Sequence, residues 1–424
     1  MGVKRWFFLA AAGVILLVLG TLCLLGESGV RGLYQSLVRY LPSLWRPTVG
    51  AALALGGLVG VALGTGMMVR RVLTAVSPKG GGSVAEALYQ ARILRNAPDV
   101  VAIGGGTGLA NLLRGMKHYT ANLTAVVTVM DTGGSSGRLR RELDVLPPGD
   151  VRNCLLALAE DEERLARFMQ YRFAAGAGLA GHALGNILLA GLEEALGGFD
   201  RAVEEASYFL SVRGQVVPAT LDKVHLVAEL ADGRTVVGEA EIAADPTPIR
   251  KIGLSRPAKA YERALQSIAE ADVIIIGPGS LYTSIVPNLL VQGIAEAINR
   301  SSAEKFVVMN LMTEPGETTG YTAYDHLRVL AEYLDLRRFT AVIVNSAPPP
   351  PDILARYQAE GSEPVRDDLR GPRTFGLRVI RAPLLAMMEI DGKTTVKHDP
   401  LKLARLLSQE SRALRRSWTR WFSP

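Results

Sequence analysis

The chain has 424 residues and a formal net charge of +6, and 48% of its residues are hydrophobic. A chain of this length exceeds one compact core, so we expect a main domain with additional segments. Its two cysteines, Cys23 and Cys154, lie far apart and exclude both a disulfide framework and a thiolate metal site, which favours a reducing compartment.

The basic charge is concentrated at the two ends of the chain. Residues 1–96 carry ten basic and two acidic side chains, residues 401–424 carry six and one, and the segment between them carries 31 and 38. The middle of the chain is therefore acidic. Because a nucleic-acid-binding domain needs a basic face of its own, this distribution argues against nucleic acid as a partner.

Two long stretches without a charged side chain occur near the start of the chain, at residues 6–26 and 48–69. Each is long enough to cross about 30 Å of hydrocarbon as a helix. A signal peptide is the alternative for the first stretch, although its apolar run is long for one and no small-residue cleavage site follows it. We predict a two-helix transmembrane anchor over residues 1–76, with the main domain facing the cytoplasm.

Glycines recur every four residues in the second stretch, at Gly56, Gly60 and Gly64. Such a row lets helices approach closely, and its partner is either the first span or another subunit, so a homo-oligomer is one expected assembly. A glycine-rich span without a specific partner is the alternative. Residues 77–96 read as a flexible linker and a short helix, and the folded domain is expected over residues 97–400.

Short apolar runs alternate with helical patterns throughout the main domain. The expected strands are residues 100–103, 123–129, 273–276, 306–310, 341–345 and 377–380, and the helices between them include 109–118, 151–160 and 289–300. Strands that are apolar throughout are buried on both faces. The pattern predicts a Rossmann-like, doubly wound α/β fold with a mostly parallel sheet.

Two further segments interrupt this alternation. Residues 224–242 alternate polar and apolar side chains around Asp232 and Gly233, which predicts a β-hairpin insert. The proline run at 348–351 predicts a rigid linker at the edge of the domain.

The loops that follow the strands form the candidate site, because open α/β sheets bind ligands beyond the carboxyl ends of their strands. Glycines let the backbone approach a phosphate, and the next helix offers free N–H groups. The loop after the first predicted strand, residues 104–108, lacks the glycine spacing of a dinucleotide-binding fingerprint and the lysine of a P-loop. Each of the loops, taken alone, is explained by an ordinary turn. Their combination predicts a shared anion-binding cleft. Its candidate residues are Gly104, Gly105, Gly106, Thr107 and Gly108; Gly133, Gly134, Ser135, Ser136 and Arg138; Gly277, Gly279, Ser280, Tyr282, Thr283 and Asn288; and Asn310 and Thr313.

Five polar side chains near these loops complete the candidate site. Asp131 is predicted to accept a bond from a ribose hydroxyl or to hold Mg²⁺, with a helix cap as the alternative. Asp150 either caps the next helix or faces the cleft with Asn153. His182 and Asn186 share a helix face and are candidates for a base, a sugar or a metal, with a buried structural histidine as the alternative. No known nucleophile or zinc motif occurs, so no catalytic residue is predicted.

Six ordered motifs resemble the CofD-like family and, within it, the YvcK branch of gluconeogenesis factors. They are IGGGTGL at 103–109, TAVVTVMDTGGSSGRLR at 124–140, PPGDVRN at 147–153, GHALGN at 181–186, IGPGSLYTSIVPNLL at 276–290 and NLMTEPGETTGYTA at 310–323. The resemblance covers residues 97–400 and implies a Rossmann-like fold with a nucleotide-type ligand.

The resemblance also implies two functions. The enzymatic branch transfers 2-phospholactate from a guanosine-linked donor to a deazaflavin precursor with Mg²⁺. The YvcK branch resembles a nucleotide-sugar-binding regulator of carbon metabolism, cell shape and wall synthesis, and the motifs at 276–290 and 312–318 favour it, with a uridine-linked sugar as ligand. This branch usually has two acids before GGSSG. Here the second is Thr132, which leaves Asp131 alone. A 2-phospho-L-lactate transferase and a membrane scaffold with a vestigial cleft are the alternatives.

Residues 401–424 have the pattern of a basic amphipathic helix. Leucines form one side, arginines the other, and Trp418, Trp421 and Phe422 end the segment. This composition predicts a helix on an anionic membrane surface, and packing on the domain is the alternative.

Overall fold

The computed structural model describes residues 94–390 and 393–415, together with isolated positions in the N-terminal segment. The chain divides into two units, Met1–Leu88 and Tyr89–Pro424, and the second unit is described below. Apart from isolated positions, the predicted membrane spans at 6–26 and 48–69 lie outside the described residues. Among the residues that are described, no helix is both long and apolar enough to cross a membrane.

An eight-stranded sheet forms the centre of the domain, in the order β10-β11-β9-β8-β7-β1-β2-β3. Every neighbouring pair is parallel except β10 with β11. This topology confirms the predicted Rossmann-like, mostly parallel sheet. The strands are β1 Val100–Gly104, β2 Leu123–Val127, β3 Gln215–Pro218, β7 Val273–Ile276, β8 Glu304–Val308, β9 Ala341–Asn345, β10 Arg373–Thr374 and β11 Leu377–Ala382.

Strand β1 shows why the sheet is apolar throughout. The side chains of Val100 and Ala102 belong to one hydrophobic cluster, and those of Val101 and Ile103 belong to another. Because successive side chains in a strand point to opposite faces, both faces of the sheet are buried. The first cluster lies under α4 Gly106–Met116, α6 Gly149–Leu158, α9 Phe199–Phe209 and α16 Pro400–Glu410.

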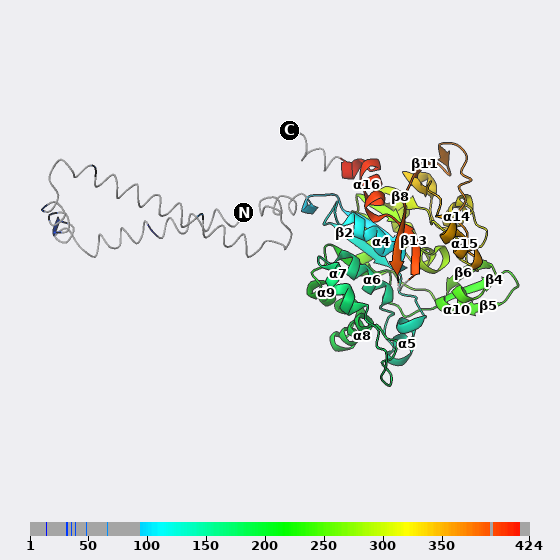
Figure 1. Cartoon of the computed structure of the whole chain (residues 1–424), viewed down its shortest axis with the longest axis horizontal. Helices are drawn as coiled ribbons and strands as arrows, with labels where there is room; N and C mark the ends of the chain where they lie inside the picture. The colour runs from blue at the N-terminus through cyan, green and yellow to red at the C-terminus, as the bar shows by residue number, and fades with distance from the viewer. Residues whose placement is uncertain are drawn as a thin grey trace. The chain divides into compact units, whose positions relative to one another are not determined.

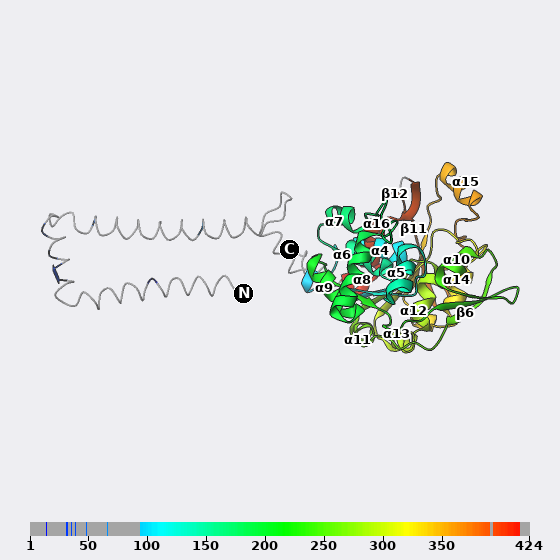
Figure 2. The same ribbon diagram turned by 90° about the horizontal axis from the view of Figure 1, so that it is seen from below.

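The second cluster is covered by helices from the later part of the chain. They are α11 Glu262–Glu270, α12 Val286–Leu290, α13 Ile294–Arg300 and α14 Ala323–Leu330. Figure 2 shows α11, α12 and α13 gathered along one side of the domain. The helices α5 Gly134–Leu143, α7 Glu162–Met169 and α8 Leu184–Leu196 lie near α6 and α9 in Figure 1, and α8 contacts each of these helices.

The predicted β-hairpin insert is present and larger than expected. Strands β4 Leu226–Leu230 and β5 Thr235–Val237 are antiparallel, and β6 Ile249–Leu254 pairs with the other side of β4. The short helix α10 Glu239–Ala244 lies between β5 and β6 in the chain. This three-stranded insert stands at one side of the domain in Figure 1.

Two predicted segments differ from the structure because of local backbone chemistry. The helix expected over 289–300 is two helices, α12 and α13, because Gly293 between them has a φ of +98°. The proline run expected as a linker instead begins α15 Pro351–Ala359, with Pro351 in its first turn. Proline is tolerated at that position because the first N–H groups of a helix have no intrahelical acceptor, so the missing N–H of proline costs no hydrogen bond.

The C-terminal segment packs into the domain. A hairpin of β12 Leu385–Ile390 and β13 Lys393–His398, which was not predicted, precedes α16. Asp399 caps α16, and Leu403, Leu407 and Leu414 are buried in the same cluster as α4. The apolar side predicted to lie on a membrane is thus covered by the domain as far as residue 415. The aromatic end at 418–422 lies outside the described residues.

Candidate functional site

The order of the central strands places the candidate site. Strand β1 lies between β2, which follows it in the chain, and β7, which begins the other half of the sheet. From β1 the chain adds strands β2 and β3 on one side of the sheet, and from β7 it adds β8 and β9 on the other side. The crevice beyond the carboxyl ends of the two strands at such a switch point is where open α/β sheets bind ligands. The glycine loop after β1 and the 277–284 loop after β7 meet there.

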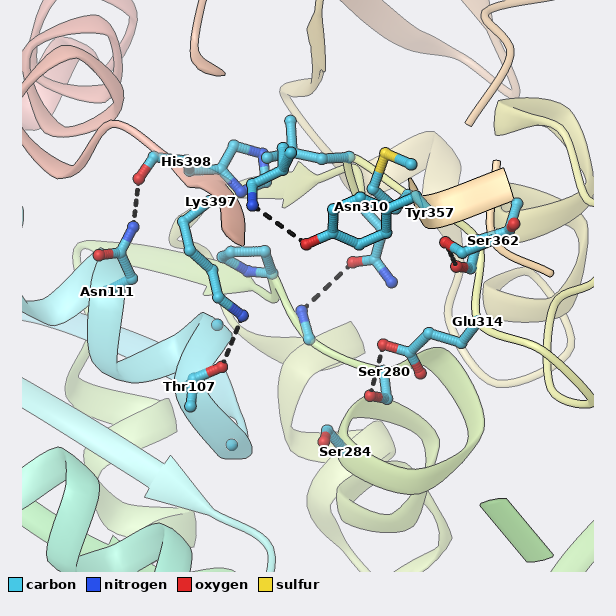
Figure 3. A pocket seen from close by; sticks show the side chains of 18 of the residues that line it. Thr107, Asn111, Ser280, Ser284, Asn310, Glu314, Tyr357, Ser362, Lys397 and His398 are labelled. Carbon is cyan, nitrogen blue, oxygen red and sulfur yellow. Dashed lines mark hydrogen bonds between the residues drawn. The ribbon is translucent and has the colours of Figure 1, made fainter. Parts of the chain in front are cut away.

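A cavity of about 360 Å³ opens at this switch point (Figure 3). The loops after β1, β7 and β8 line it from the sheet, and α15, the segment after it and β13 line it from the C-terminal part of the chain. Predicted residues in its wall are Gly105, Gly106, Thr107, Gly108, Gly279, Ser280, Asn310 and Thr313. The structure therefore brings three of the four predicted loops together around one cavity.

Two glycines let these loops approach one another. A Cβ at Gly108 would lie 2.6 Å from the carbonyl oxygen of Pro278, in the loop after β7. A Cβ at Gly105 would lie 2.6 Å from Cγ2 of Thr128 and 2.7 Å from Oδ2 of Asp150. A larger residue at Gly108 would push the loops after β1 and β7 apart, whereas one at Gly105 would displace the side chains of Thr128 and Asp150.

The carboxyl group of Asp150 lies against the glycine loop. It accepts a hydrogen bond from the backbone N–H of Gly106. Burial, with the nearby charge of Asp131, raises the pKa of Asp150 to about 6 even though this hydrogen bond and Arg152 favour the charged form. Asp150 does not cap α6, since Pro148 is at the cap position and α6 has no side-chain cap hydrogen bond. Asp150 instead occupies one side of the loop that was predicted to bind phosphate.

Two glutamates lie near the loop after β7: Glu317 is buried, and Glu314 is half-buried in the cavity wall. Ser280 Oγ donates to Glu314 at 2.8 Å, and Thr283 Oγ1 donates to Glu317 at 3.0 Å. Burial raises the pKa of both carboxyl groups, and the adjacent charge of Glu314 helps raise that of Glu317 to about 8. Glu317 consequently carries a proton at neutral pH.

A second pair of carboxyl groups lies beside the loop after β2. Asp131 Oδ1 accepts from the N–H of Gly133 at 2.7 Å, and the carboxyl of Glu239, from α10, hydrogen-bonds to Asp131. Burial and the charge of Asp131 raise the pKa of Glu239 to about 7. Within the described part of the chain, no group of three histidine, cysteine, aspartate or glutamate side chains is arranged to hold a metal ion.

The remaining polar residues near the loop after β2 form a hydrogen-bonded cluster, the Ser135 network, which consists of Ser135, Ser136, Arg152, Asn153, His182 and Asn186. Asn186 Nδ2 donates to Ser135 Oγ at 3.1 Å, and Arg152 donates to Asn186 Oδ1 at 2.7 Å. Arg152 also donates to Asn153 Oδ1 at 3.0 Å. The network joins the start of α5 to α6 and α8.

The network also determines the protonation of His182. The backbone N–H of Ala183 and Asn186 Nδ2 both donate to Ser135 Oγ, so the hydroxyl proton of Ser135 goes to His182 Nδ1, 3.0 Å away. His182 then carries its proton on Nε2, and burial lowers its pKa, which keeps it neutral. The shared helix face predicted for His182 and Asn186 is wrong, because α8 begins at Leu184 and His182 precedes it. The two side chains are joined instead through Ser135 Oγ.

The comparisons with known proteins agree with this geometry. A family model described as 2-phospho-L-lactate transferase CofD matches residues 100–385. The chain belongs to the CofD family. Within this family it is 44% identical to the gluconeogenesis factor of Bacillus subtilis over 311 residues, which cover 73% of this chain and 97% of that protein.

Two further relatives extend the comparison. A gluconeogenesis-factor relative from Nostoc sp. is 44% identical over 417 residues, covering 96% of this CofD-family chain and 90% of the relative. A crystal structure of a Bacillus halodurans protein superimposes with a TM-score of 0.70 at 44% identity, covering 74% of this chain and 99% of that one. These likenesses place the chain among the gluconeogenesis factors of the CofD family.

Several predicted residues of this CofD-family chain lie behind the cavity wall and support it. Asn288 Nδ2 donates to the carbonyl oxygens of Gly104 and Ser284 at 3.1 and 2.7 Å. The Tyr282 hydroxyl pairs with that of Tyr321 at 3.0 Å. These side chains position the loops. The other predicted residues that do not line the cavity are Gly104, Asp131, Gly133, Gly134, Ser135, Ser136, Arg138, Asp150, Asn153, His182, Asn186, Gly277 and Thr283.

Several cavity residues were not predicted from the sequence. They lie in α4, in the loops after β7 and β8, at the end of α15 and just after it, or in the C-terminal hairpin, and only tertiary packing brings them together. The motifs at 276–290 and 312–318 were signals for Ser284 and Glu314, whereas no pattern singled out the others. They are Asn111, Ser284, Glu314, Tyr357, Glu360, Ser362, Lys397 and His398.

Proposed function

We propose that this chain binds a nucleotide sugar, or a related nucleotide conjugate, in the cavity at the β1–β7 switch point. In this proposal it acts as a gluconeogenesis-factor-type regulator that affects carbon metabolism, cell shape and wall synthesis. The observation that carries the proposal is the position of a glycine loop and a helix N-terminus in the wall of that cavity. Helix N-termini with glycine loops bind phosphate groups.

The cavity has two chemically different ends. The glycine loop, Thr107 and Lys397 favour an anion, whereas Glu314 and Asn310 supply acceptors for hydroxyl or amide hydrogens. A volume of about 360 Å³ lies in the ordinary range for small-molecule sites. A nucleotide sugar joins phosphates to hydroxyl-rich rings and therefore matches both ends.

A transferase of the 2-phospho-L-lactate type is the second candidate function. The observation that favours it is Glu317, a carboxyl group near the loop after β7 whose raised pKa suits proton transfer near neutral pH. Asp131 and Glu239 are the carboxyl pair that would hold Mg²⁺, which would supply charge neutralisation for a phosphate. A guanosine-linked donor would then be the ligand.

Thermal denaturation with a panel of ligands separates the two candidates. UDP-sugars at about 100 times their dissociation constant are expected to add about 2.7 kcal/mol to stability and to raise Tm by several degrees. Guanosine nucleotides are expected to leave Tm unchanged. A shift with guanosine nucleotides alone would favour the transferase, and the absence of a shift with every UDP-sugar would contradict the proposed ligand.

We further propose that residues 1–76 tether the domain to a membrane, with the domain on the cytoplasmic side. Two charge-free stretches long enough to span a bilayer support this proposal. The Nostoc relative aligns with 96% of this chain and so shares most of the N-terminal segment. A Thermotoga maritima relative aligns over 99% of its own length with only 74% of this chain.

Cell fractionation tests the tether. The full chain is expected in the membrane pellet after carbonate washing, and protease added to intact cells should leave the domain uncut. The matched control is a variant that begins at residue 89, which is expected in the supernatant. Recovery of the full chain in the supernatant would rule out the tether.

A further inference from the structure

Lys397 is a cavity residue that the sequence did not single out. It lies on β13, and its Nζ donates to Thr107 Oγ1 at 2.9 Å, in the first turn of α4 (Figure 3). An ammonium group has three donors, so two remain for a ligand. Among the described residues that line the cavity, Lys397 is the one lysine or arginine.

The charge of the cavity depends on this lysine. His398 is the neighbouring basic residue, and burial lowers its pKa to about 4, which leaves it neutral at physiological pH. Glu314 and Glu360 are the carboxyl groups in the wall. Burial lowers the pKa of Lys397, while the nearby charge of Glu314 opposes this effect and favours the ammonium form.

The first turn of α4 presents backbone donors next to the lysine. The first intrahelical bond runs from the N–H of Leu109 to the carbonyl of Gly105, so the N–H groups of Thr107 and Gly108 come before it. Such N–H groups attract anions. The glycine loop has no lysine of its own, and β13 places one beside it from 290 residues further along the chain.

Only one side of the glycine loop is open to an anion. On the other side, the N–H of Gly106 already donates to Asp150, and Asp150 and Thr128 stand close against Gly105. A negative carboxylate there would repel a phosphate. The approach that remains is from the cavity, where Lys397 lies.

The lysine is held in place by bonds from its two neighbours. The N–H of Val396 donates to the Tyr357 hydroxyl at 3.1 Å, and Asn111, on α4, donates to the carbonyl of His398. Both contacts fix β13 against the cavity wall. Little further ordering is then needed when a ligand binds, which favours affinity.

We propose that Lys397 is the phosphate-binding cation of this site and that, with Thr107 and the first N–H groups of α4, it holds the phosphate groups of the ligand. In this arrangement Glu314, across the cavity in Figure 3, faces the uncharged, hydroxyl-bearing part of the ligand. The inference rests on the proposed function where it takes that phosphate to belong to a nucleotide conjugate.

Isothermal titration calorimetry with inorganic pyrophosphate and with UDP-glucose tests this role in the full chain. Lys397→Met is expected to weaken the binding of both probes by about 10- to 100-fold, the loss typical of a hydrogen bond to a charged group. Thr107→Val removes one neutral partner and is expected to weaken both by about two- to tenfold. The matched control is Lys251→Met, an exposed lysine on β6 that removes the same charge and should leave both affinities unchanged.

The outcomes separate this inference from the proposed function. Pyrophosphate binding that depends on Lys397, with no binding of UDP-glucose or any other UDP-sugar, would refute the nucleotide sugar and support the phosphate site. Lys397→Met that binds pyrophosphate as tightly as the unmodified chain would overturn the role of Lys397. If Lys397→Met fails to fold, as urea denaturation would show, unchanged affinity in Thr107→Val would overturn the site. Failure of the unmodified chain to bind either probe would overturn both.

Discussion

Replacing Gly108 by alanine is expected to destabilise the domain by about 1–3 kcal/mol, the usual cost of overpacking, and to abolish ligand binding. The new Cβ would lie 2.6 Å from the carbonyl oxygen of Pro278, 2.9 Å from its carbonyl carbon and 3.2 Å from Cα of Gly279. All three are backbone atoms. They cannot rotate away as a side chain would, so the loops after β1 and β7 must separate.

The separation is costly because both loops are fixed from behind. Asn288 donates to the carbonyl of Gly104, and the N–H of Gly277 donates to the carbonyl of Ile103 at 2.9 Å. Moving the loops apart strains these hydrogen bonds and widens the phosphate-binding side of the cavity. The substitution therefore affects stability and ligand binding together.

Urea denaturation followed by circular dichroism measures the stability, and calorimetry with UDP-glucose measures the binding. Gly191→Ala is the matched control, since a Cβ there meets nothing within 4 Å and Gly191 lies in α8. Alanine at that position is expected to leave binding unchanged and to add up to about 1 kcal/mol of stability. Equal stability and binding in Gly108→Ala and the unmodified chain would refute the proposed contact between the loops.

The sheet and the loops that line the cavity were predictable because their signals are local. Buried strands such as β7 are apolar throughout, and glycines such as Gly105 and Gly279 directly follow strand ends. The edge strand β3 was missed because it has four residues and no strong pattern. The hairpin of β12 and β13 was missed for a similar reason, because its polar and apolar residues alternate only weakly.

The charged residues of the cavity were not predictable, because they come from distant parts of the chain. Lys397 follows the glycine loop by almost 300 residues, and nothing around it in the sequence indicates a ligand. The sequence also does not show whether a polar side chain is already paired within the protein. Asn186 illustrates this, because the bonds that would have reached a ligand join it to Ser135 and Arg152.

The contribution of Glu317 to the stability of the domain is expected to fall as the pH rises from about 4.5 to about 8, and Glu317→Gln is expected to remove this contribution. Burial and the charge of Glu314 raise the pKa of Glu317 from 4.5 to about 8. Between these values the folded state binds a proton that the unfolded state has lost. The part of the free energy of unfolding that comes from Glu317 therefore decreases with pH until Glu317 ionises in the folded state.

Glutamine resembles the protonated form of this side chain. Thr283 can still donate to its carbonyl oxygen, and its amide can donate to Glu314 where the carboxyl proton did. Glu317→Gln should match the unmodified chain near pH 5 and be more stable near pH 8, by on the order of 2 kcal/mol. Urea denaturation at several pH values measures the difference.

Glu205→Gln, on the exposed surface of α9, is the control because it removes the same charge without a buried partner. Its pH profile should follow that of the unmodified chain. An unchanged profile in Glu317→Gln would show that Glu317 is not the group that titrates. The carboxyl of Glu317 lies next to Glu314 behind the cavity. If the stability of Glu317→Gln depends less on pH and its affinity for UDP-glucose is unchanged, the proton on Glu317 stabilises the loop after β7 and takes no part in ligand binding. A loss of affinity at every pH would instead assign Glu317 to the ligand site.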